Sequence, residues 1–214
     1  MPAVAQKISS LVIPMLLSQW SAHPIFFKGT PKLSESNRQL TIETENAAGG
    51  YVYIFPKPVA IEANTRLGWK WAISKFPQKE IRLPLKKSTD DFAVRIGVLL
   101  SDGTSRISLP GNLQKALPKS LPLSYVLFYC ATPQEDPKMV CEVSPYHKNF
   151  VNCMKKASQN KESIAELPLR DLASAKNLGK KPNLKAVGLW LFADSDNLKT
   201  RSEAQVSDLV LSNN

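Results

Sequence analysis

Asp91 and Arg95 are the first residues that could do chemistry, and they lie in the segment Asp90-Asp91-Phe92-Ala93-Val94-Arg95. Side chains alternate along a strand, so Asp91 and Arg95 are expected on one face and Phe92 and Val94 on the other. The small residues Ala93 and Gly97 leave space around Arg95, whose guanidinium needs an acidic or carbonyl partner. The pattern predicts either a buried structural ion pair or an arginine that contacts a ligand in a shallow cleft.

Asp194-Ser195-Asp196-Asn197 is the second such segment, and it directly follows the apolar run 184–193. Alternating oxygen side chains in a turn can cap the backbone or bind a hard cation such as calcium. Asp194 and Asp196 are therefore candidate calcium ligands, although the motif offers fewer ligands than a full calcium loop, and no other cofactor is expected. The candidate ligand-binding set combines the polar residues of both segments with one aromatic residue: Asp91, Arg95, Asp194, Asp196, Asn197 and Trp71.

Catalytic motifs are scarce in this sequence. His23 and His147 are its only histidines, and it contains no nucleophile elbow, phosphate-binding loop, dinucleotide fingerprint or zinc-protease motif. These absences argue against triad catalysis and against nucleotide chemistry. Glycoside hydrolysis needs only two suitably spaced carboxylates, and five acids are candidates: Asp90, Asp91, Asp194, Asp196 and Glu203.

Three cysteines, Cys130, Cys141 and Cys153, leave at least one thiol unpaired. If the runs 123–131 and 139–143 form a hairpin, Cys130 lies opposite Cys141, and we predict a disulfide between them with Cys153 as a buried thiol. The alternatives are a Cys141–Cys153 bond, if 139–143 pairs with 149–154, and three reduced thiols in a cytosolic protein. The cysteine and histidine spacing matches no zinc site, so no metal other than calcium is considered.

The elements that must position these residues are predicted to be strands, because apolar and polar residues alternate between proline- and glycine-rich turns. Strands are predicted at 40–44, 51–55, 67–73, 92–100, 123–131, 139–143, 149–154, 163–169, 184–193 and 204–212, and short helices near 112–117 and 170–178. Without a βαβ rhythm, this order predicts an all-β fold: a sandwich of two antiparallel sheets with a few short helices.

The N-terminal segment carries a compartment clue, because Ala3-x-Ala5 is the small-residue pattern found beside a signal-peptidase cut. We expect residues 1–15 to be an N-terminal segment left after a signal peptide was removed, and residues 16–214 to be a single sandwich domain. The expected location is periplasmic or secreted, with a cytoplasmic protein as the alternative. No apolar run approaches the ~18 residues of a membrane span, so no transmembrane segment is expected.

The net charge of +10 comes from 21 lysines and 7 arginines scattered along the 214 residues. Nucleic-acid binders concentrate basic groups, favour arginine and interleave aromatic residues, so no nucleic-acid partner is expected. Scattered lysines are typical of a solvated surface, and the alternative is attraction to an anionic polymer of the cell envelope or to a membrane surface.

The order of several motifs over residues 16–212 resembles a bacterial family, domain of unknown function 3047. They are Leu67-x-Trp69-x-Trp71, Asp90-Asp91-Phe92-Ala93-x-Arg95, Leu123-x-Tyr125-Val126, Ser144-Pro145-Tyr146, Arg170-Asp171-Leu172 with Gly179, and Asp194-x-Asp196-Asn197. The resemblance implies a jelly-roll sandwich of the galactose-binding or carbohydrate-binding-module type, often exported. The sequence departs from the family at Leu127, where an aromatic residue is usual, and in a shortened helix after Arg170.

Three functions are compatible with these observations. The first is a non-catalytic exported module that binds a glycan or another polar envelope ligand on a sheet face. The second is a glycan-active hydrolase that uses paired carboxylates. The third is a structural module that binds other proteins.

Overall fold

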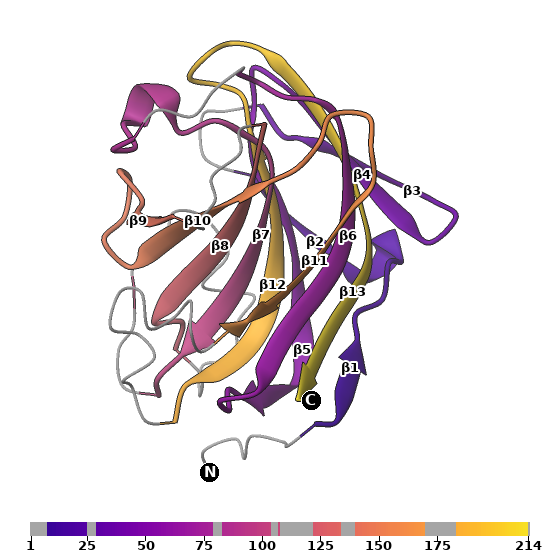
Figure 1. Cartoon of the computed structure of the whole chain (residues 1–214), viewed down its shortest axis with the longest axis vertical. Coiled ribbons are helices and arrows are strands. Elements are labelled where there is room, and N and C mark those ends of the chain that lie inside the picture. Colours follow the sequence, from indigo (N-terminus) through magenta and orange to yellow (C-terminus); the bar gives the residue numbers. More distant parts are fainter. Residues whose placement is uncertain are drawn as a thin grey trace.

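The protein is a jelly-roll sandwich of two β-sheets, seen in a computed structural model that describes residues 8–24, 29–78, 83–103, 107, 122–133, 140–169 and 183–213 (Figure 1). The seven-stranded sheet runs in the order β2 (Ser21–Pro24), β5 (Ala48–Ala60), β12 (Lys185–Asp194), β7 (Phe92–Ser101), β8 (Tyr125–Thr132), β10 (Phe150–Lys156) and β9 (Cys141–Val143). The six-stranded sheet runs β11 (Ser163–Pro168), β6 (Thr65–Lys75), β13 (Arg201–Asn213), β4 (Gln39–Glu45) and β3 (Lys32–Ser36), and β1 (Ser10–Val12) also pairs with β13.

The predicted all-β fold is confirmed. The only complete helices among the described residues are two three-residue 3-10 turns, Leu17–Gln19 and Lys87–Thr89. The helices predicted near 112–117 and 170–178 lie outside the described residues, as do Arg170, Asp171 and Gly179. No helix in the described ranges has the length and apolar character needed to cross a bilayer.

The core between the sheets comes from strands that alternate as the sequence indicates. Trp69 and Trp71 of β6 are buried against each other, with ring centroids 5.2 Å apart, and Trp69 also packs on Tyr129 of β8. The same core contains the inward residues of β7 and β12, such as Ile96 and Leu191. The N-terminal residues join it too, because β1 pairs with β13 and Ile13 is buried.

The seven-stranded sheet is also apolar on its outer face, the face turned away from the other sheet. A second buried cluster there includes Phe92, Phe128, Trp190 and Phe192. Every residue of β7 is buried as a result. A charged side chain on a sheet with both faces buried needs an opposite charge or hydrogen-bond partners. Arg95 lies in this strand, so its partners have to be identified.

Strand β5 is longer than predicted. Gly49 and Gly50, which precede the predicted strand 51–55, lie within it, and it continues through Pro56 and Pro58 to Ala60. The prolines are tolerated because residues 55–58 bulge out of the β5–β12 ladder, which pairs Ile54 with Gly188 and resumes only at Val59 and Ala186.

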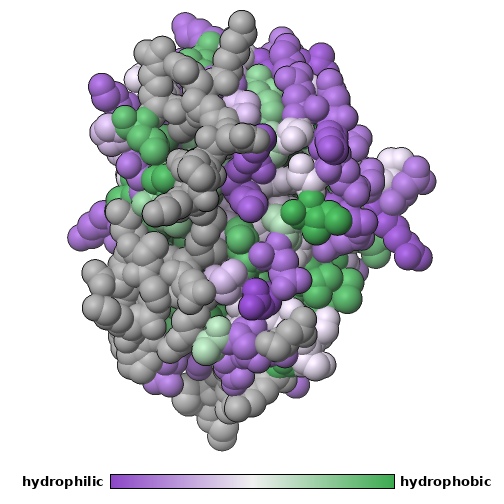
Figure 2. All heavy atoms as spheres, in the orientation of Figure 1, coloured by the Kyte–Doolittle hydropathy of each residue, from purple (hydrophilic) through white to green (hydrophobic). Residues whose placement is uncertain are grey.

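The surface is mainly hydrophilic over the right-hand part of the face in Figure 2, where hydrophobic residues form small separate patches. In the part of the chain that the structure describes, the large hydrophobic residues that are exposed come from distant segments: Val12, Leu16, Leu83, Val143, Tyr146 and Ile164. Scattered apolar residues of this kind are normal for a globular surface. Tyr146 is the exception, because it borders the pocket described next.

Candidate functional site

A bulge at the start of β7 puts Phe92 on the same outer face of the seven-stranded sheet as Arg95. Arg95 pairs with Phe192 of β12, but the next pair is Phe92 with Asp194, so Ala93 and Val94 together face the single residue Ala193. Simple alternation predicted Phe92 on the face opposite Arg95, and this prediction is wrong. The extra residue turns Phe92 to the Arg95 side, while Ala93 and Val94 both enter the core.

Arg95 is only 4% exposed and is held by two carboxylates. Its Nη1 lies 3.3 Å from Asp90 Oδ2 and its Nη2 lies 3.4 Å from Asp194 Oδ2, while Nη2 also donates to the Asp90 backbone carbonyl. The guanidinium packs on three rings, Phe92 at 4.6 Å, Phe192 at 5.2 Å and Phe128 at 5.9 Å from the centroids. The predicted ion pair of Arg95 is therefore confirmed at Asp194, and Asp90 is a further partner.

Burial dominates the electrostatics of this cluster. Desolvation raises the pKa of Asp90 and raises the pKa of Asp194 well above its usual value, against the opposing attraction of Arg95. A hydrogen bond with Asp196 and the charges of Asp91 and Asp196 raise the Asp194 pKa further. Desolvation would lower the Arg95 pKa, but Asp90, Cys130 and Asp194 outweigh it, so the guanidinium stays charged.

Asp91 has a different task, because it fixes the loop that follows β12. Its Oδ1 accepts from Asn197 Nδ2 at 2.7 Å, and its Oδ2 accepts from the Leu198 backbone N–H at 2.8 Å. The Tyr146 hydroxyl lies 2.9 Å from Asn197 Oδ1 and 2.9 Å from the Lys87 carbonyl, and it can donate to either. These contacts bring together the loop after β12, the start of β7 and the loop between β9 and β10.

A cavity of about 300 Å³ opens at this junction. Among the described residues, its charged lining consists of Asp90, Arg95, Asp194 and Asp196. Its remaining lining is mostly aromatic: Phe128, Tyr146, His147, Phe150, Trp190 and Phe192, with Ser144 and Ala48. A concave, mostly apolar site with a few fixed polar groups is typical of small-ligand pockets.

Five of the six predicted site residues meet here: Asp91, Arg95, Asp194, Asp196 and Asn197. Trp71 does not, and its assignment as a ligand contact is wrong. It is 1% exposed and packs against Trp69 in the core between the sheets, because its strand β6 belongs to the other sheet.

The aromatic wall was missed by sequence reasoning, although part of it carried a signal. Tyr146 lies in the Ser144-Pro145-Tyr146 motif, which was noted without a role. Phe192 is the cross-strand partner of Arg95, and Phe128 and Trp190 both pair with Gly97, so a correct strand order would have put them on the Arg95 face. Gly97 makes room for them, because a Cβ there would lie 2.6 Å from Cε1 of Phe128.

Two buried donors of the pocket lining have no acceptor among the described residues. They are Nε of Arg95 and Nε1 of Trp190, which is 4% exposed. Buried N–H groups without partners are rare in proteins. Both nitrogen atoms are covered by protein, so a ligand in the pocket does not reach them.

The acidic group near the pocket mouth has the oxygen ligands that calcium prefers. Carboxylate oxygens of Asp91, Asp194 and Asp196 lie within 4.8 Å of one another. Asp194 is already paired with Arg95, and Asp91 already accepts N–H bonds from the loop. Calcium binding at Asp194 and Asp196 therefore stays a prediction.

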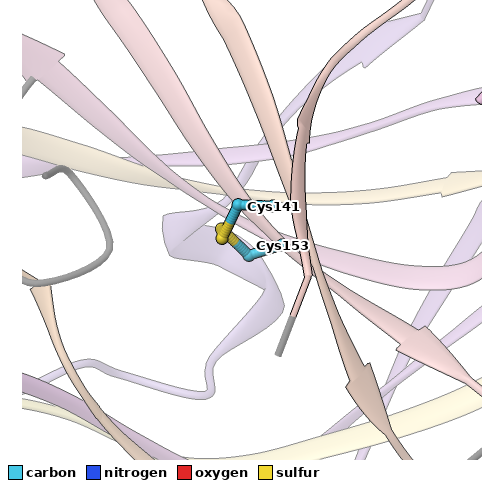
Figure 3. Close-up of a disulfide and its surroundings, with 2 residues drawn as sticks. All are labelled: Cys141 and Cys153. Carbon is cyan, nitrogen blue, oxygen red and sulfur yellow. A yellow bond between two sulfur atoms is a disulfide. The ribbon is translucent and has the colours of Figure 1, made fainter. Parts of the chain in front are cut away.

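The disulfide joins Cys141 to Cys153, so the predicted Cys130–Cys141 bond is wrong (Figure 3). The reason is strand order: β10 lies between β8 and β9, pairing parallel with β8 and antiparallel with β9, where Cys153 faces Cys141. The parallel pair is also a departure from the expected antiparallel sheets. Cys130 is the buried free thiol. The disulfide links β9 to β10, and the loop between these strands supplies Ser144, Tyr146 and His147 to the pocket.

Comparison with known proteins gives a family and a fold. The family model described as "Protein of unknown function (DUF3047)" matches residues 24–210. No curated protein matches the sequence.

Solved structures with a similar fold share little sequence with this chain. A family 12 xyloglucanase from Bacillus licheniformis superposes with a TM-score of 0.51 at 8% identity, covering 96% of this chain and 99% of the other. The xyloglucanase domain of NopAA from Sinorhizobium fredii, in complex with cellobiose, gives 0.46 at 8% identity with 100% and 99% covered. Endoglucanase 3 from Trichoderma harzianum gives 0.44 at 8% identity with 99% and 94% covered. At this identity the likeness concerns the fold alone.

Proposed function

The chain belongs to the DUF3047 family. We propose that it is a non-catalytic module that binds a glycan in the pocket on the outer face of the seven-stranded sheet. The observation that carries the proposal is the pocket itself, where aromatic rings surround a fixed charged floor. Aromatic faces pack on the apolar faces of sugar rings, and fixed polar groups bind the hydroxyls.

The engagement of the carboxylates supports binding without catalysis. Asp90 and Asp194 both hold Arg95, and Asp91 holds the backbone and side chain of the loop after β12. A general acid or nucleophile has to reach the glycosidic bond, so carboxylates committed to internal partners are poor candidates. We also propose a periplasmic or secreted location, because disulfides such as Cys141–Cys153 persist in oxidising compartments.

A glycan-active hydrolase remains the second candidate, because one observation favours it. The pKa of Asp194 is raised well above its usual value, while oxygens of Asp91 and Asp194 lie within 4.8 Å of each other. Two nearby carboxyls in different environments are the arrangement that supplies an acid and a base in glycosidases. The xyloglucanase of Bacillus licheniformis shares the fold, and a shared fold by itself carries no activity.

Calorimetric titration with a panel of oligosaccharides tests the proposal, together with an assay for released reducing ends. We expect binding without release. Tyr146→Ala removes a ring that is 51% exposed at the pocket rim, so it should weaken binding by about tenfold while the fold is kept. Ile164→Ala, on the exposed surface of β11, is the matched control and should leave affinity unchanged.

Two results would decide against the proposal. Binding that Tyr146→Ala leaves intact would place the ligand elsewhere. Release of reducing ends that Asp194→Asn abolishes would establish the hydrolase instead.

A further inference from the structure

The ionisable groups of the pocket lining are mostly acidic, although the protein around it is basic. The chain carries a net charge of +10, yet the described residues of the pocket lining contribute three carboxylates and one guanidinium. Oxygens of Asp91, which lies behind the lining, are within 4.8 Å of carboxylate oxygens of Asp194 and Asp196. Charges in a partly enclosed, low-dielectric site are screened far less than charges on the surface.

The rings of the pocket are also suited to a cation. Phe128, Trp190 and Phe192 form a contiguous cluster with centroids 5.0 to 6.0 Å apart, and two of these rings already contact the Arg95 guanidinium. At the rim, the Lys87 ammonium lies 5.6 Å from the centroid of Tyr146. Cations are attracted to aromatic faces, and most strongly where water is excluded.

Resting on the proposed function, we infer that the pocket prefers a glycan whose sugar residue carries a protonated amino group over neutral or acidic glycans. The ammonium donates to the carboxylate of Asp196, which lies in the lining beside the aromatic wall. An acidic sugar would place its own carboxylate next to the acidic residues of the lining. Like charges brought together in a site that excludes water weaken binding.

Three tetrasaccharides that differ only in the substituent at C2 test the inference: chitosan tetraose with an amine, chitin tetraose with an acetamide and cellotetraose with a hydroxyl. By calorimetry on the full chain below neutral pH, we expect chitosan tetraose to bind at least about tenfold more tightly than the other two, as a charge-assisted hydrogen bond implies.

Two variants, one that removes a negative charge and one that removes a positive charge, are expected to change the affinity for chitosan tetraose in opposite directions. Asp196→Asn removes one carboxylate from the lining and should bring the affinity ratio of chitosan tetraose to cellotetraose below about threefold. Lys87→Gln removes the cation at the rim and should tighten chitosan tetraose while leaving cellotetraose unchanged, and it lies in an exposed 3-10 turn where folding is not at stake.

The outcomes separate the two proposals. If cellotetraose or chitin tetraose binds as tightly as chitosan tetraose, the amine preference is overturned and the glycan pocket stands. If none of the three binds, the proposed function itself fails.

Discussion

Arg95 is the residue on which the buried charge cluster depends. It contacts the carboxyl groups of both Asp90 and Asp194 on the outer face of a sheet that is apolar on both sides. Arg95→Ala would leave two carboxylates buried without a cation, and this should lower the free energy of unfolding by about 3–5 kcal/mol. Chemical denaturation measures the change.

Arg201→Ala is the control for that prediction. Arg201 also pairs with two carboxylates, Glu43 and Glu203, but its side chain is half exposed. Exposed pairs contribute about 0–1 kcal/mol, so this variant should be close to wild type. Equal losses from Arg95→Ala and Arg201→Ala would contradict the buried role of Arg95.

Asp194 should make the stability depend on pH. Its pKa is raised in the folded state, so the folded protein holds the proton more tightly than the unfolded chain does. This stabilisation is complete below the usual aspartate pKa of about 3.9 and is lost as the pH rises through the raised pKa. Asp194→Asn keeps a neutral side chain at every pH.

We therefore expect the free energy of unfolding of Asp194→Asn to fall less steeply between about pH 4 and pH 8 than that of the wild type. Urea denaturation at a series of pH values measures both slopes. Indistinguishable slopes for wild type and Asp194→Asn would refute the assignment.

Strand β7 shapes the pocket through a missing side chain. A Cβ at Gly97 would lie 2.6 Å from Phe128 Cε1 and 3.2 Å from Val126 Cγ1, so Gly97→Ala must displace a ring of the pocket wall. We expect a loss of stability of about 1–3 kcal/mol and weaker ligand binding. Gly68→Ala in β6 is the control, because its nearest neighbour would be 3.8 Å away.

Calorimetry and thermal melting of both glycine variants give the comparison. A Gly97→Ala protein with wild-type affinity would show that Phe128 does not position the ligand. A Gly68→Ala protein as damaged as Gly97→Ala would show that strand propensity, rather than the ring contact, causes the loss.

The sequence predicted which segments form strands better than it predicted which strands pair with each other. Strands β6, β7 and β12 alternate cleanly, so their existence followed from the residues. Strands β2 and β3 were missed because they are short and mostly polar. The bulge at Ala93 and the position of β10 between β8 and β9 depend on pairing between distant segments, which alternation within one strand does not encode.

The candidate site was predictable for a related reason. Asp91, Arg95, Asp194, Asp196 and Asn197 lie at the ends of two strands that pair with each other, so local motifs were sufficient. Trp71 was assigned wrongly because alternation shows which residues share a face, and not which side of the sandwich that face meets.

At the scale of the molecule, charge separates two kinds of binding. The lysine-rich exterior should attract an anionic polysaccharide such as polygalacturonate, and raising the salt from about 0.05 M to about 0.5 M should abolish that attraction by screening. Binding of a neutral sugar in the pocket should be insensitive to the same change. Co-sedimentation and calorimetry at both salt concentrations measure the two effects.

Competition provides the control for this separation. Cellotetraose at saturation should leave the sedimentation of polygalacturonate unchanged, because the two ligands occupy different surfaces. Displacement of the polymer by the tetrasaccharide would place both at the pocket.

The position of β13 imposes an order of assembly on the chain. This strand lies at the centre of the six-stranded sheet and pairs with β6, β4 and β1, all of which precede it in the sequence. During synthesis these three strands leave the ribosome with unpaired edges and cannot form their sheet until β13 follows them. Such late, long-range closure is slow and leaves edges open to association with other chains. The sandwich must therefore close after translation of the domain, and a chaperone that covers strand edges would raise its yield.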